Sequence, residues 1–150
     1  MTAEPAASAE AARDVGLAEA LADLAHYVLH LFADAGRSHK LSQQQVELIC
    51  AVITRGAVGM TELGSLLHVE KSNLSNLVDR LEQRGLVVRS RDPRDRRATR
   101  VSLTSEGTAI AMQTRDDVIM GLRGQLSHLS PDDQRLLAAV ARELPQAGQR

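Results

Sequence analysis

Arginine is concentrated in one short part of the 150-residue chain. Between Arg80 and Arg100, eight arginines stand against Glu82, Asp92 and Asp95, which gives this segment a charge of +5 while the whole chain carries −1. The guanidinium of arginine can donate two hydrogen bonds to phosphate oxygens and can enter a narrow DNA minor groove. This segregation of charge is therefore typical of a surface that contacts a polyanion. A solvated charged loop without a partner is the alternative that composition alone leaves open.

A helix-turn-helix is predicted just upstream of the arginines. Thr61 is expected to cap a short helix, residues 68–70 form a turn, and a second helix follows. The apolar face of the second helix repeats at i, i+3, i+4 and i+7, through Leu74, Leu77, Val78 and Leu81. Its outward side chains are polar, namely Ser72, Asn73, Ser75, Asn76, Asp79, Arg80 and Gln83. The asparagine, serine and arginine side chains among them have donors and acceptors that match base edges in the DNA major groove.

Asp79 and the residues after this helix complete the motif. A phosphate would oppose Asp79, so we expect this carboxylate to hold Arg80 or a wing arginine. Gly85 is placed to end the helix, and a strand is predicted from about Leu86. A loop around Pro93 separates this strand from a second one at 98–103, so the two runs form an antiparallel hairpin with a charged tip, a wing.

Further helices are predicted before and after this unit, and the first of them has a continuous apolar face. From about residue 14 to 36 one helix carries apolar residues at the alternating four and three spacing of a heptad, Leu17, Leu21, Leu24, Val28 and Leu31. Ser42 is expected to cap the next helix, and Thr104 and Ser130 are expected to cap two further helices towards the C-terminus. The apolar face of the first helix is wide enough to contact two neighbours, of which one could be a second subunit.

Composition limits the class of protein. The chain has no Trp, one Tyr and one Phe, which favours a mostly helical protein with aliphatic layers. One domain over residues 14–144 is expected, with mobile tails at 1–13 and 145–150. A single cysteine and the lack of a signal-peptide pattern predict a cytoplasmic protein, and no apolar run is expected to approach the ~18 residues of a membrane span.

Motifs for catalysis are not found in the sequence. It holds no glycine-rich phosphate loop, nucleophile elbow or metal-binding helix motif, so we expect no enzyme activity, no cofactor and no metal site.

The segment NLVDRLEQRGLVVRSRDPRDRRATRVSLTSEG is similar to the recognition helix, wing and following helix of the MarR family of winged helix-turn-helix transcriptional regulators. The wing signature of that family matches Asp95-Arg96-Arg97, then residues 101–104 and Gly107. The resemblance implies a mostly α fold with a small β-hairpin wing. The winged helix-turn-helix would cover about residues 42–103, and dimerisation helices would cover about 14–36 and 104–144.

The resemblance also implies a function and a set of DNA contacts. It describes a homodimeric repressor of an inverted-repeat operator in double-stranded DNA, relieved by a small ligand. Arg97 would enter the minor groove and Asp95 would orient the wing. The predicted DNA contacts are Ser72, Asn73, Ser75, Asn76, Arg80, Arg94, Arg96 and Arg97.

A ligand pocket and a sensing site are further candidate features of the chain. Family resemblance implies a pocket between the dimerisation helices and the DNA-binding lobe, lined by Tyr27, His30, Phe32, Arg37 and His39. Metal sensing through His26 and His30 at i, i+4 is an alternative, as is redox sensing through Cys50, although a buried free cysteine is usually a small apolar residue. A winged-helix interaction module without operator specificity is the remaining alternative.

Overall fold

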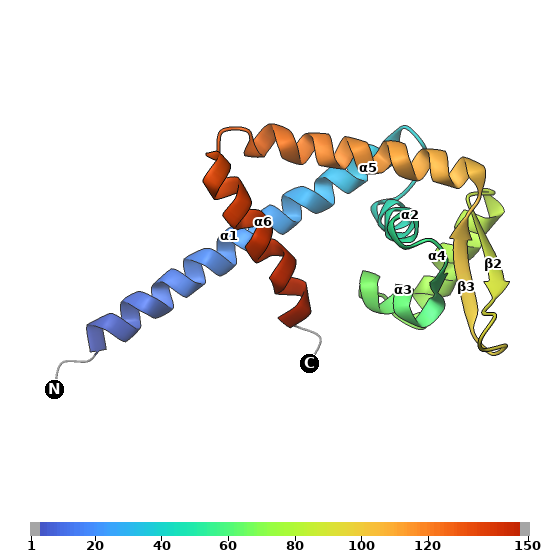
Figure 1. Ribbon diagram of the computed structural model, residues 1–150, viewed down its shortest axis with the longest axis horizontal. Coiled ribbons are helices and arrows are strands. Elements are labelled where there is room, and N and C mark those ends of the chain that lie inside the picture. Colours follow the sequence, from blue (N-terminus) through green and yellow to red (C-terminus); the bar gives the residue numbers. More distant parts are fainter. Residues whose placement is uncertain (1–3, 148–150) are drawn as a thin grey trace. The chain divides into compact units, whose positions relative to one another are not determined.

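The computed structural model describes the backbone of residues 4–147 and the side chains of residues 15–144. Helices dominate this part of the chain, and a small antiparallel sheet interrupts them (Figure 1). The elements are α1 (Glu4–Arg37), α2 (Gln43–Arg55), β1 (Val58–Gly59), α3 (Met60–Leu67), α4 (Lys71–Gln83), β2 (Val87–Arg91), β3 (Thr99–Leu103), α5 (Ser105–Leu126) and α6 (Pro131–Ala147). They form two compact units, up to Val118 and from Ile119 onwards. The predicted class, mostly α with a β-hairpin wing, is confirmed.

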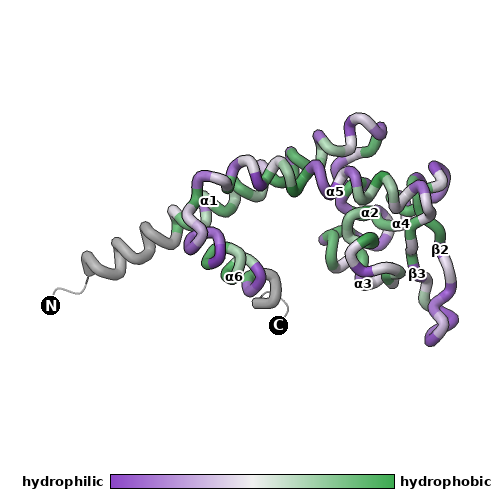
Figure 2. Tube along the Cα trace, turned by 45° about the horizontal axis from the view of Figure 1, so that its top comes forward, coloured by the Kyte–Doolittle hydropathy of each residue, from purple (hydrophilic) through white to green (hydrophobic). Residues whose placement is uncertain are grey.

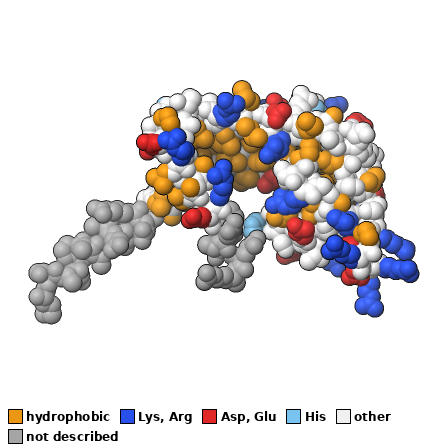
Figure 3. Space-filling view, in the orientation of Figure 1, with side chains coloured by type: hydrophobic (Ala, Val, Ile, Leu, Met, Phe, Trp, Pro, Cys, Tyr) orange, Lys and Arg blue, Asp and Glu red, His pale blue; other side chains and the backbone are white. Residues whose placement is uncertain are grey.

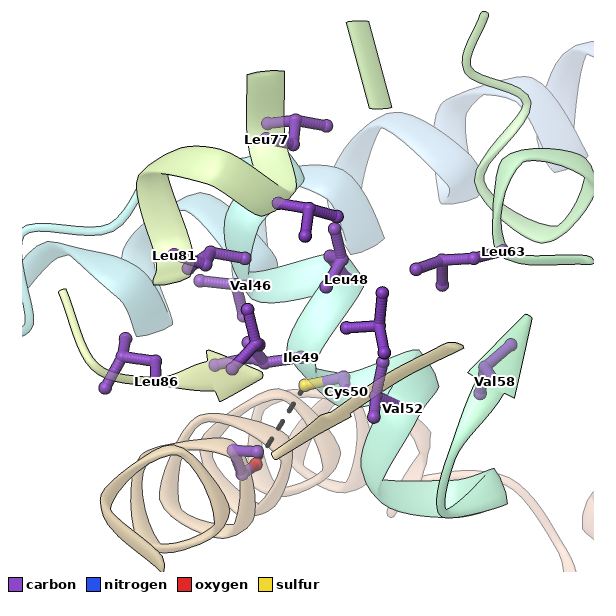
Figure 4. Close-up of a cluster of buried hydrophobic side chains, with 14 of the residues drawn as sticks. Val46, Leu48, Ile49, Cys50, Val52, Val58, Leu63, Leu77, Leu81 and Leu86 are labelled. Atoms are coloured by element: carbon purple, nitrogen blue, oxygen red, sulfur yellow. Dashed lines mark hydrogen bonds between the residues drawn. The ribbon is translucent and has the colours of Figure 1, made fainter. Parts of the chain in front are cut away.

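The core of the first unit is built around α2. Ser42 caps this helix through a capping box, in which the Gln45 N–H donates to Ser42 Oγ at 3.2 Å and the Ser42 N–H donates to Gln45 Oε1 at 2.9 Å. Buried aliphatic side chains from α2, α3, α4 and the sheet meet here (Figure 4). They include Val46, Leu48, Ile49, Val52, Val58, Leu63, Leu77, Val78, Leu81, Leu86 and Val101. This core fixes α4 against the sheet.

The wing is the predicted hairpin with one further strand beside it. β3 is the central strand, and it pairs antiparallel with β2 from Val87↔Leu103 to Arg91↔Thr99. On its other edge β3 pairs with β1, where Val58 lies opposite Val101. The sequence did not predict β1, because two residues are too short to show an alternating pattern.

The sequence predicted the end of α4 correctly but not the start of α3. The prediction that Thr61 caps α3 is wrong, because β1 leads directly into this helix and Gly59 is its N-cap. Gly85 does end α4 as predicted, with φ of 73°, a conformation that favours glycine. The Leu86 N–H then donates to the Leu81 carbonyl at 3.0 Å, so the chain turns at once into β2.

The first helix is longer than the sequence predicted. α1 begins at Glu4 rather than near residue 14, because the alanine-rich segment favours helix although it lacks an apolar period. Residues 1–3 and 148–150 of the expected tails lie outside the described residues, and the mobility of 4–13 stays a prediction.

The Val15–Arg37 part of α1 is long and apolar enough to span a membrane by length and composition, contrary to expectation. The core helix of a soluble protein can have the same length and composition.

The second unit contains the end of α5 and α6. Ser130 caps α6 as predicted, since the Asp133 N–H donates to Ser130 Oγ at 3.1 Å. The helix continues to Ala147, beyond the predicted boundary at 144. Its apolar side chains are exposed in the single chain, at Leu136, Leu137, Val140 and Leu144.

Candidate nucleic-acid interface

The outward face of α4 is polar, as the sequence predicted. Leu74, Leu77, Val78 and Leu81 are buried, which turns the opposite side of the helix to solvent. Four of the predicted contact residues are exposed on this side, Ser72, Asn73, Asn76 and Arg80. Ser75 is only partly exposed, and its carbonyl and hydroxyl accept hydrogen bonds from Arg89 of β2. Ser75 therefore faces the base of the wing.

The tip of the wing presents three of the predicted arginines. Arg94, Arg96 and Arg97 are all exposed, and the hairpin tip is hydrophilic and rich in basic side chains (Figures 2 and 3). Two aspartates shape the loop: the Arg94 N–H donates to Asp92 Oδ1 at 2.8 Å and the Arg97 N–H donates to Asp95 Oδ1 at 3.0 Å. Short side chains that accept from a backbone N–H two residues on favour tight turns. Asp95 is thus in a position to orient Arg97.

Two carboxylates of α4 and one arginine of β2 join the wing to this helix. Arg89 Nη1 lies 2.7 Å from Asp79 Oδ1 and 3.3 Å from Glu82 Oε1. The expectation that Asp79 holds Arg80 or a wing arginine is therefore confirmed for a wing arginine. Arg89 could not be singled out from the sequence, because spacing along the chain does not show which strand arginine contacts the helix.

Two other arginines of the basic segment donate hydrogen bonds to backbone carbonyls of the same chain. Arg84 donates to the carbonyls of His39 and Lys40 at 2.7 and 2.9 Å, at the turn between α1 and α2. Arg100 Nη2 donates to the Ala57 carbonyl at 2.8 Å. With Arg89, three of the eight arginines thus have internal partners. The interpretation of this segment as a polyanion surface is therefore restricted to the other arginines, for which it stays a prediction.

A groove of about 1090 Å³ separates the helix-turn-helix from the base of the wing. Its lining includes Thr61 and Ser65 of α3, Lys71 at the start of α4, and Arg89 and Arg97 of the wing. Basic and hydroxyl side chains therefore line an open channel beside α4 together with acidic and apolar ones, among them Glu62, Glu70 and Leu74.

The five residues of the predicted ligand pocket do not share one environment. Phe32 packs against the core, whereas the exposed His30 and Arg37 both pair with Asp34, at 3.1 and 2.8 Å. Tyr27 and His39 are partly exposed, and His39 Nε2 is buried without a hydrogen-bond partner. None of the five lines the groove beside α4, so the pocket at this place stays a prediction.

Cys50 and the histidines show no sensing constellation among the described residues. Cys50 is buried, with Sγ 4.0 Å from the Ala111 carbonyl and 3.7 Å from Thr114 Oγ1 (Figure 4). Burial raises the pKa of the Cys50 thiol, which disfavours the reactive thiolate. In the part of the chain that the structure describes, no group of three His, Cys, Asp or Glu residues could hold a metal ion.

A polar helix in a helix-turn-helix beside a basic β-hairpin defines the winged helix-turn-helix class of DNA-binding proteins. Residues 41–99 match the model of the MarR family. A curated relative is YkoM of Bacillus subtilis (strain 168), an uncharacterized HTH-type transcriptional regulator. It is 26% identical over 107 residues, which are 71% of this chain and 70% of that protein. The resemblance to the MarR family of transcriptional regulators that the sequence indicated is thus confirmed for residues 41–99.

Solved structures share this fold at lower sequence identity. A mutant of E. coli MarR complexed with operator DNA superposes with a TM-score of 0.70 at 22% identity, covering 88% of this chain and 95% of that one. NadR in complex with 4-hydroxyphenylacetate superposes with a TM-score of 0.74 at 22% identity, covering 83% and 89%.

Proposed function

We propose that this protein is a cytoplasmic, homodimeric repressor that binds an inverted-repeat operator and is released by a small ligand, and that it is not an enzyme. The observation that carries the proposal is the pairing of two DNA-reading surfaces in one compact unit. Asn73 and Asn76 are exposed on α4, and Arg94, Arg96 and Arg97 are exposed on the wing tip. Asparagine can pair with adenine edges in the major groove, while the wing arginines suit the minor groove or phosphates.

Exposed apolar side chains support the proposed dimer. Leu17, Leu21 and Leu24 on α1 are 62%, 38% and 40% exposed in the single chain. Leu136, Val140 and Leu144 on α6 are exposed as well. A monomer in water rarely leaves this much aliphatic surface open, so these helices are suited to a subunit interface about a two-fold axis.

The small ligand is proposed from relatives and not from a cavity. NadR has been crystallised with 4-hydroxyphenylacetate, and BpsR of Bordetella bronchiseptica is regulated in its DNA binding by 6-hydroxynicotinic acid. An aromatic acid is the class of effector that we therefore propose for this chain.

In vitro selection from a randomised duplex library tests the operator. The selected sequences should converge on an inverted repeat with half-site centres about 10 bp apart, because two-fold related recognition helices meet successive major grooves. Binding without convergence would instead favour the interaction module that lacks operator specificity.

Light scattering at micromolar concentration tests the dimer in the same preparation. Val140→Asp should lower both the dimer fraction and the DNA affinity, because it buries an unpaired carboxylate at the interface. Arg142→Asp offers a control at an exposed polar position on the opposite side of the same helix. A wild-type protein that stays monomeric and still binds its selected duplex tightly would contradict the dimer.

A further inference from the structure

Arg89 bridges the wing and the recognition helix α4 through several hydrogen bonds at once. Besides Asp79 and Glu82, its Nη2 reaches the Ser75 carbonyl at 3.2 Å. Its backbone N–H also donates to Glu82 Oε2 at 3.1 Å. Residues 75, 79 and 82 follow the i, i+4, i+7 spacing, so they lie along one side of α4 across two turns. A single guanidinium on β2 thus holds two turns of the helix.

These contacts occupy the directions that Arg89 would need to bind DNA. The guanidinium has five N–H donors in a fixed plane, and here it forks between two carboxylates and a carbonyl. Its side chain is 25% exposed, whereas Arg94, Arg96 and Arg97 at the wing tip are open to solvent. Arg89 is therefore built into the protein while the tip arginines remain accessible.

Asp79 and Glu82 would be unfavourable on this helix if they acted alone. Their side chains are 50% and 43% exposed, on the element that we propose to enter the major groove. A carboxylate near phosphates repels them, so electrostatics alone predicts that removing either acid tightens DNA binding. Their presence has a physical reason if they serve as anchors for Arg89.

We propose that Arg89 is a positioning residue for DNA binding, an inference that rests on the proposed function. The hydrogen bonds from its guanidinium to Ser75, Asp79 and Glu82 fix the angle between the wing and the recognition helix. The wing tip and the asparagines of α4 can then reach their grooves together. Binding energy is lost when the wing must be ordered on contact, since ordering flexible groups costs free energy. Lysine cannot make the same hydrogen bonds, because its single ammonium cannot reach acceptors on two helical turns in one plane.

The decisive variant is Asp79→Asn, because the two explanations predict opposite changes in DNA affinity. The positioning role predicts weaker binding, whereas electrostatic repulsion alone predicts tighter binding. We expect it to weaken binding to a fluorescein-labelled duplex, selected by the wild-type protein, by about tenfold in fluorescence anisotropy. Asp117→Asn, at an exposed acid of α5, is the matched control and should leave the affinity unchanged. Tighter binding by Asp79→Asn would overturn the proposal.

Salt dependence separates positioning from direct contact. Arg89→Met should weaken DNA binding by a factor similar to that of Asp79→Asn, while the slope of log K against log salt stays at the wild-type value. A residue that neutralises a phosphate makes this slope shallower by about 0.9 per contact. The Asp79→Asn, Arg89→Met double variant should bind no worse than the weaker single variant, because both changes break one network. A slope change near 0.9 for Arg89→Met would reassign Arg89 to the phosphates.

Two further measurements test the geometry. Arg89→Lys should bind as weakly as Arg89→Met, and full affinity with lysine would show that charge alone matters. In the protein without DNA, ¹⁵N relaxation should show lower order parameters for residues 92–98 in Arg89→Met, with α2 unchanged. An equally rigid wing would contradict the proposal. This readout needs no DNA, whereas a wild-type protein that selects no sequence would contradict the proposed function instead.

Discussion

Gly107, in the first turn of α5, lies directly against the connection from α4 to β2. A Cβ at this position would lie 1.9 Å from the Leu86 carbonyl oxygen and 2.8 Å from its carbonyl carbon. These are backbone atoms, and the Leu86 carbonyl also accepts the Thr104 N–H at 3.0 Å. No side-chain rotation can relieve the clash. Gly107→Ala must therefore move α5 away from the base of the wing by about 1 Å or more.

The size of the effect follows from two opposing terms. Overpacking a close contact costs about 1–3 kcal/mol. Alanine in place of glycine inside a helix recovers up to about 1 kcal/mol. We therefore expect Gly107→Ala to lower the free energy of unfolding by about 1–2 kcal/mol, with the strain centred on the contact between α5 and Leu86.

Urea unfolding followed by circular dichroism measures this difference, with the protomer concentration held fixed because a dimer's stability depends on it. Gly124→Ala is the matched control, since it lies in the same helix and a Cβ there would meet nothing within 4 Å. It should raise stability by up to about 1 kcal/mol. If Gly107→Ala unfolds at the same urea concentration as Gly124→Ala, the close approach of α5 to Leu86 is refuted.

Three more predictions concern DNA contacts and the buried thiol. Arg97→Ala should weaken binding to the selected duplex and make the salt slope shallower by about 0.9 per protomer, with the melting temperature unchanged; full affinity at physiological salt would contradict a groove contact. Asn76→Ala should cost about 1–3 kcal/mol on the selected duplex and far less on random DNA, and equal losses on both would assign Asn76 to the backbone. Because burial raises the pKa of Cys50, the folded state binds its proton more tightly than the unfolded state does. The stability from the neutral thiol is therefore complete below the unfolded pKa of about 8.5 and is lost as the pH rises through the higher folded pKa. Cys50→Ala should flatten the alkaline fall in urea midpoint, and an identical pH profile in both proteins would refute the assignment.

The local signals in the sequence determined much of the fold. The 3.6-residue period of Leu74, Leu77 and Leu81 placed α4 and its polar face, and glycine at 85 marked where that helix ends. Alternation at 99–103 indicated the wing strand β3. These predictions succeeded because each depends on residues close together in the chain.

The sequence by itself also predicted the family and the basic wing, but only the tertiary structure decided what each arginine does. Arg84, Arg89 and Arg100 have the same chemistry as Arg94, Arg96 and Arg97, and no spacing rule separates the two groups. The partners of Arg84 and Arg100 lie more than 40 residues away in the chain, at His39, Lys40 and Ala57. A guanidinium binds whichever carbonyl or carboxylate lies within about 3 Å, and packing of distant elements sets that distance. The charge of each arginine is therefore visible in the sequence. Whether its side chain binds a partner within the protein or stays exposed to solvent is decided only when the chain folds.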